Sequence, residues 1–274
     1  MKKLAVIVIF ISLCILFSLS LYENTHKIPA SNDINVVEKP SIIEAYASKK
    51  TVSNEVITQS DHLDRERLFQ NANNIRICRR VPKTQSELDT WAERAHANDE
   101  YYEIIDSMHR KFKMCLGIAD RDGPYVDMLI EAAEKGSDKA VSLLWLLGDV
   151  ELVDELKLKD VLRDEQVSRR QAFIATKYRL AHKVALQGGE NSMLKLISGF
   201  QHLDPQTGGQ DYVKSLAFAY FFVEVVSNSE VFGRVEWTIR DLEGKMSPEE
   251  IIQANELTRD FLVQHRALST LKVR

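Results

Sequence analysis

Acidic side chains gather in the C-terminal quarter of the sequence, where Glu236, Asp241 and Glu243 are followed by Glu249 and Glu250. Two carboxyl groups on either side of a glycosidic bond can act as general acid and general base. A simpler interpretation is favoured for Glu249 and Glu250, because acidic residues in the first turn of a helix interact favourably with the helix dipole. A cell-wall hydrolase is therefore kept as the alternative hypothesis, and a structural role is preferred.

Other catalytic patterns are missing from the sequence. It contains no metalloprotease helix signature, nucleophile elbow, phosphate-binding glycine loop or dinucleotide fingerprint. His109 lies on an apolar stripe with Phe112, which favours a packed histidine over a catalytic base. We therefore expect no catalytic residue, no metal and no cofactor.

Aromatic residues cluster around position 220. At helical spacing Phe218, Phe221 and Phe222 share one face and are expected in a core, whereas Tyr220 points elsewhere. Tyr220 and the nearby Tyr212 are our candidates for contact with a partner.

Cys78 and Cys115 are two of the three cysteines, the third being Cys14. Zinc needs about four ligands at short paired spacings, and the nearest histidines make no such pair with either cysteine. If the chain is exported, a Cys78–Cys115 disulfide is the favoured pairing, with two separate buried thiols as the alternative.

The amino terminus predicts export. Lys2 and Lys3 precede residues 4–22, a run without charge that would reach about 28 Å as a helix, close to the thickness of a bilayer core. We interpret residues 1–22 as a signal peptide or a signal anchor, with cleavage left open. The rest of the chain is then expected in the periplasm or on the extracytoplasmic face of the inner membrane.

Composition indicates a soluble helical body. The chain is 45% hydrophobic and 28% charged, and its 11 glycines and 6 prolines are few for a turn-rich β protein. The net charge of −4 becomes −6 without Lys2 and Lys3, so nucleic acid is not expected as a partner. Residues 23–72 lack helical periodicity and are interpreted as a flexible tether, before a helical domain at 73–266 and a tail at 267–274.

Local signals divide that domain into helices. Thr84 with Glu87 forms a capping box, and Asn98 is expected to end the helix in a left-handed conformation. Pro124 suits the first turn of a helix that stops at Gly136. The expected segments are 84–98, 102–117, 124–136 and a terminal helix from Ser247, which has Pro248 and Glu250 in its first turn.

One pattern recurs along the chain. Ala133 and Gly136 match Ala185 and Gly188, and each pair ends one helix just before the next begins. Looser copies place Asn98 and Asn228 at the glycine position. The charged stretch 151–170 between the two clear copies predicts an extra helix or an extended helix pair, and a repeat of this kind favours stacked helical pairs.

Three segments carry a resemblance to a known family: EAAEKGSDKAVSLL, VALQGGENSMLKL and GGQDYVKSLAFAYFF. They resemble Sel1-like repeats, relatives of the tetratricopeptide repeats found in exported bacterial proteins. The resemblance covers about residues 84–264 and implies an all-α, right-handed solenoid of antiparallel helix pairs, although the 52-residue spacing from Gly136 to Gly188 exceeds the usual repeat.

The resemblance implies a non-enzymatic protein that binds another protein on a concave surface, where Tyr212 and Tyr220 are expected. Two roles remain open: a scaffold in an envelope assembly, and an immunity-type protein that neutralises a secreted toxin. The alternative is a periplasmic cell-wall hydrolase that uses Glu236, Asp241 and Glu243, or an accessory factor without a dedicated ligand. If residues 4–22 are retained, the membrane is a further partner.

Overall fold

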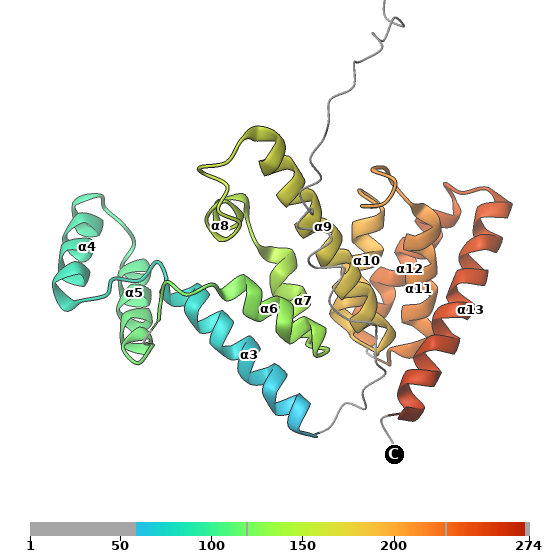
Figure 1. The fold of residues 1–274 in the computed structure, drawn as a ribbon, viewed down its shortest axis with the longest axis horizontal. Coiled ribbons are helices and arrows are strands. Elements are labelled where there is room, and N and C mark those ends of the chain that lie inside the picture. The colour runs from blue at the N-terminus through green and yellow to red at the C-terminus, as the bar shows by residue number, and fades with distance from the viewer. Residues whose placement is uncertain (1–58, 119, 228, 272–274) are drawn as a thin grey trace, which may run out of the picture. The chain divides into compact units, whose positions relative to one another are not determined.

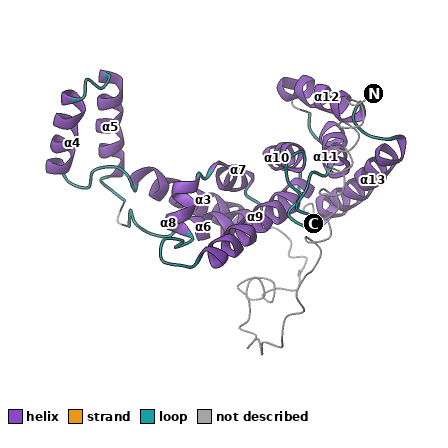
Figure 2. Ribbon diagram, turned by 90° about the horizontal axis from the view of Figure 1, so that it is seen from above, coloured by secondary structure: helices purple, strands orange, loops and turns teal. Residues whose placement is uncertain are grey.

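The computed structural model describes residues 59–118, 120–227 and 229–271, which belong to a unit of the chain that begins at Val52. Every regular element in these ranges is an α-helix, and no strand occurs in them (Figure 2). The helices are α3 (Gln59–Cys78), α4 (Gln85–Ala97), α5 (Tyr102–Cys115), α6 (Tyr125–Glu134), α7 (Asp138–Leu146), α8 (Asp149–Glu155), α9 (Arg163–Leu186), α10 (Glu190–Phe200), α11 (Tyr212–Val225), α12 (Ser229–Glu243) and α13 (Pro248–Leu271). The predicted all-α class is confirmed for this part of the chain.

Most helices pack against helices that are close to them in the sequence (Figure 1). α3 packs on α6, α6 on α7 and α9, α10 on α9 and α11, and α11 on both α12 and α13. Fully buried side chains from successive helices form one continuous core, among them Leu129, Leu144, Leu180, Leu196 and Phe218. Neighbour-to-neighbour packing is typical of helical repeats. The right-handed superhelix itself stays a prediction.

The two clear copies of the repeat turn have the same geometry. Gly136 and Gly188 adopt φ angles of 89° and 93°, in the left-handed region that glycine occupies without strain. In both copies the next N–H bonds back across the turn: Ser137 donates to the Ala132 carbonyl, and Gly189 donates to that of Val184. The prediction that these glycines end helices is confirmed.

The first copy of the turn differs by one residue from the prediction. α4 ends at Ala97 with Asn98 as its C-cap, close to the expected end. Asn98 has φ −96°, however, and Asp99 takes the left-handed conformation with φ 54°. The Glu100 N–H then donates to the Ala95 carbonyl, as in the glycine turns. Aspartate replaces glycine here because its short polar side chain tolerates this region better than most residues. Asn228, the other looser copy, lies outside the described residues.

The C-terminal ends of α6 and α9 are hydrogen-bonded to side chains of other helices. Lys183 of α9 donates to the carbonyl oxygen of Glu134, the last residue of α6, over 2.7 Å. His265 of α13 donates through Nδ1 to the carbonyl of Leu186, the last residue of α9, over 2.9 Å. Carbonyls at a helix C-terminus have no partner within their own helix. Side chains of α9 and α13 therefore bind the terminal carbonyls of α6 and α9, respectively.

The charged insertion forms α8 and lengthens α9 to 24 residues, as predicted. Two ion pairs bond α8 to the C-terminal end of α3: Arg76 of α3 pairs with Glu151 at 2.8 Å, and Arg79, the residue after α3, pairs with Glu155. Arg79 also lies over the ring of Tyr125. Arg79 is therefore held by contacts within the fold.

Two predicted boundaries need correction. Helix α3 begins at Gln59 and buries Ala72 completely, so the tether predicted for 23–72 cannot extend to residue 72. Helix α13 continues to Leu271, beyond the predicted start of the tail at 267. The export segment 1–22 lies outside the described residues. Among the helices of the described part, none is long and apolar enough to cross a membrane.

The α4–α5 hairpin has a small core of its own. Cys78, at the end of α3, and Cys115, at the end of α5, are both fully buried and form the predicted disulfide, with Cα atoms 5.5 Å apart. Leu88 and Phe112 pack beside it. The guanidinium of Arg121 donates to the carbonyls of Pro82 and Cys115, which ties the segment after α5 to both sides of the hairpin.

Candidate functional site

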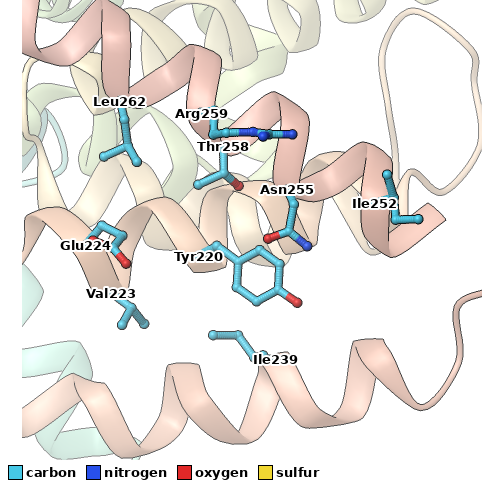
Figure 3. Close-up of a pocket in the computed structure, with 9 residues that line it drawn as sticks. All are labelled: Tyr220, Val223, Glu224, Ile239, Ile252, Asn255, Thr258, Arg259 and Leu262. Carbon is cyan, nitrogen blue, oxygen red and sulfur yellow. The ribbon is translucent and has the colours of Figure 1, made fainter. Parts of the chain in front are cut away.

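An open groove of about 530 Å³ lies where α12 and α13 pack on α11 (Figure 3). Because both helices contact α11, this central helix forms the floor and the other two form the walls. Nine residues line the groove: Tyr220, Val223, Glu224, Ile239, Ile252, Asn255, Thr258, Arg259 and Leu262. Five of them come from α13, so this helix supplies most of the lining residues.

The register of α11 places Tyr220 in this groove. Phe218, Phe221 and Phe222 are buried, as the helical spacing predicts, and Tyr220 is directed to the other side of the helix. Its hydroxyl donates a hydrogen bond of 2.6 Å to the carboxylate of Glu243 at the end of α12. Burial, with the neighbouring carboxylate, raises the pKa of Tyr220 well above its ordinary value. The phenol therefore stays protonated and fixes α12 to α11.

The α13 wall presents one stripe of side chains. Ile252, Asn255, Arg259 and Leu262 are spaced three or four residues apart, which places them on one helical face. Thr258, beside them, uses its hydroxyl within the fold, donating to the carbonyl of Ala217 or Ala254. It anchors α13 to α11 and leaves the stripe facing the groove.

Polar groups on this wall retain bonding capacity. The amide nitrogen of Asn255 donates to the carbonyl of Ile251, while its side chain extends toward the ring of Tyr220 in Figure 3. The Arg259 side chain is largely exposed, and its ion pair with Glu256 is long, at 3.9 Å. The groove thus combines apolar walls with an amide and a guanidinium, a composition suited to binding a protein segment.

The structure separates the two tyrosines that were predicted to contact a partner. Tyr220 lines the groove, but Tyr212 is the first residue of α11 and is not part of the lining. The Tyr212 hydroxyl donates to the side chain of Gln210. Sequence reasoning missed the α13 residues because each is ordinary by itself. The spacing of Ile252, Asn255 and Arg259 was the available signal.

Three of the carboxylates considered for hydrolysis have other partners. Asp241 forms an ion pair of 2.6 Å with Lys245, and Glu243 accepts from Tyr220. Glu250 accepts from the backbone N–H of Ser247, which completes the predicted capping box. No cluster of three or more potential metal ligands occurs among the residues that the structure describes.

His109, the histidine weighed as a catalytic base, is half-buried on α5. His202 is exposed. His182 packs edge-on against Phe218 and Phe261. Burial among these rings, with Lys214 nearby, lowers the pKa of His182 below its ordinary value. His182 is therefore part of the core packing of α9, α11 and α13.

No family model matches this chain, and neither the curated proteins nor the solved structures contain a significant match to it.

Proposed function

We propose that this chain is a non-enzymatic helical-repeat protein that binds another protein in the extracytoplasmic space. In this proposal the helix pairs form a right-handed solenoid of the Sel1-like type, and the groove over Tyr220 is the binding surface. The role is that of a scaffold in an envelope assembly or of an immunity-type protein for a secreted toxin.

The observation that supports binding most strongly is the open groove between α12 and α13. Ile252, at the edge of the groove, is an apolar side chain that is 58% exposed. It shares one face of α13 with Leu262 and with the polar groups of Asn255 and Arg259. Grooves with apolar walls and a few oriented polar groups are the surfaces into which amphipathic helices bind. A partner helix in this groove would bury Ile252 and pair with Arg259.

The proposed compartment is supported by two features. Residues 4–22 form an uncharged apolar segment after two lysines, and Cys78 and Cys115 form a buried disulfide. Disulfides persist in oxidising compartments and are rare in the cytosol. Both features agree with export of the body of the chain.

The hydrolase alternative is not proposed. A general acid and base need two carboxyl groups that face a shared substrate. Asp241 and Glu243 instead pair with Lys245 and Tyr220.

Site-specific photocrosslinking tests the proposal. A photoreactive phenylalanine analogue is placed at Ile252, at the edge of the groove, or at Trp237 on α12. The two residues are similarly exposed, 58% and 61%. Trp237 is two positions from the groove residue Ile239, so it points away from the groove.

In cells that produce the protein, we expect a discrete crosslinked protein from position 252 and none from 237. No adduct at 252, or the same adduct at both positions, would contradict the proposed surface.

A further inference from the structure

Lys177 of α9 is a half-buried lysine in an aromatic environment. Its ammonium lies 5.1 Å from the ring centre of Trp145 and 5.5 Å from that of Phe173. Among the described residues no hydrogen bond or carboxylate charge acts on this ammonium, and burial is the only influence on its ionisation. The two rings offset only part of the cost of removing a charge from water.

Two other lysines in the helical body show what Lys177 lacks. Lys183, six residues further along α9, pairs with Glu134 at 2.9 Å. Lys214 of α11 pairs with the buried Asp204 at 2.7 Å and also lies near an aromatic ring, that of Phe200. Burial alone lowers the pKa of Lys177, whereas bonds to Asp204 and Asp211 raise the pKa of Lys214 despite its burial.

Exposed apolar side chains occur on α7, α8 and the N-terminal part of α9. Leu146 follows Trp145 at the end of α7 and is 63% exposed. Val150 of α8 and Val167 of α9 are 66% and 45% exposed. An ion pair between Arg170 and Asp149 holds the start of α8 against α9. Val167, Arg170 and Lys177 are spaced by three and seven residues, so they share one face of α9.

We propose that this α7–α9 surface, made of Trp145, Leu146, Val150, Val167 and Lys177, binds an acidic amphipathic helix of another protein. A carboxylate of the partner pairs with the Lys177 ammonium, and the apolar face of the partner covers Leu146, Val150 and Val167. Charge complementarity favours an acidic partner helix, because its carboxylate supplies the counter-ion that Lys177 lacks within the fold.

A protein segment suits this surface better than a small carboxylic acid. Val167 and Lys177 are ten residues apart on α9, a rise of about 15 Å. Small ligands need concave sites that enclose most of their surface. The apolar residues here are instead exposed along three helical elements, which a helix of similar length can cover.

Peptide binding tests the proposal on the folded protein. The chain has three tryptophans, so the substitutions Trp91→Phe and Trp237→Phe leave Trp145 as the fluorescent reporter. The probes are synthetic amphipathic peptides that carry leucine on one face and either Glu, Gln or Lys at its edge. We expect the Glu peptide to bind most tightly and to change the emission of Trp145. The substitution Lys177→Met should weaken that binding about 10-fold or more, since it removes one partner of a partly buried charge pair.

Control variants separate the charge from the fold. Lys177→Arg should retain binding, and Lys111→Met, at an exposed lysine of α5, should leave it unchanged. Leu146→Ser alters an exposed side chain and should weaken binding without loss of helicity. If Lys177→Met does not fold, the peptide series and Leu146→Ser decide the question.

Several results would overturn the proposal: equal binding of the Glu, Gln and Lys peptides, no binding of any peptide, or unchanged binding by a folded Lys177→Met variant. Binding of decanoate but not of the Glu peptide would identify a small-molecule site and also reject it. The surface is separate from the Tyr220 groove, so Ile252→Asp should not affect the Glu peptide. Loss of binding in that variant would place the peptide in the groove and contradict the proposal.

Discussion

The carboxylate of Asp138 accepts hydrogen bonds from both the backbone N–H of Ser192, at 2.8 Å, and its hydroxyl, at 2.6 Å. Asp138 is the first residue of α7, whereas Ser192 lies in the first turn of α10. Gly189, the residue before α10, has no side chain to cap that helix. Asp138 therefore caps α10, which joins α7 to α10 through a polar contact in addition to the apolar core.

Replacing Asp138 by alanine should lower the free energy of unfolding by about 2 kcal/mol, at the upper end for a helix cap, because the first turn of α10 loses an acceptor for several donors. Urea unfolding of the purified protein measures this. Thr84→Ala removes only the local cap of α4 and should cost less. A loss at Asp138 no larger than that at Thr84 would contradict the role of Asp138 as the cap of α10.

Alanine at Gly136 or Gly188 should destabilise the protein by about 1 to 2 kcal/mol, since both glycines hold positive φ angles that strain other residues. Gly117→Ala is the matched control, because Gly117 has no positive φ angle and a Cβ added there would meet no other atom within 4 Å. Thermal unfolding of the three variants gives the comparison. Equal stability of all three would show that the turns can adopt another backbone conformation.

Replacing both Cys78 and Cys115 by alanine should cost about 2 to 5 kcal/mol, and the loss should be local. The α4–α5 hairpin buries only a small cluster around the disulfide, whereas α9–α11 share the large core. Hydrogen exchange should therefore show early loss of protection in α4 and α5. Uniform loss across all helices would instead indicate a single cooperative unit.

The Arg76–Glu151 pair should make stability depend on pH. Burial opposes ionisation of Glu151, but hydrogen bonds from Arg76 and the Gly148 N–H overcome it and hold the pKa of Glu151 below its ordinary value. A lowered folded-state pKa stabilises the fold above the unfolded pKa of about 4.3, and this stabilisation is lost as pH falls through the folded pKa.

Glu151→Gln should therefore lower the melting temperature at pH 7 and have a smaller effect near pH 3. Thermal unfolding of parent and variant at both pH values measures the difference. A gap that stays constant or widens at low pH would contradict the role assigned to this pair.

Local chemistry made part of this fold predictable. Gly136, Gly188 and the Ser247 cap are recognisable because turn and cap residues act within a few positions of themselves. Helix α3 was missed because its sequence is strongly polar. Its weak apolar stripe through Leu68 and Ala72 can be recognised as a buried face only once α3 is packed on α6.

The groove depends on relationships that no local pattern encodes. Tyr220 could be separated from the core phenylalanines by helical spacing alone. Its neighbours Ile252 and Asn255 come from another helix, and only the packing of α12 and α13 on α11 brings them together. The ion pair of Arg79 with Glu155 was missed for the same reason, because these residues meet only through tertiary packing.

The central claim is that the groove over Tyr220 binds a protein partner. The most direct measurement is the dissociation constant of the partner recovered by crosslinking at position 252, for the parent protein and for the variants Ile252→Asp and Trp237→Asp. A charge in an apolar groove is costly unless it is paired, so Ile252→Asp should weaken binding about 10-fold or more, while Trp237→Asp should leave it unchanged. Equal affinities for the parent and Ile252→Asp would contradict the account.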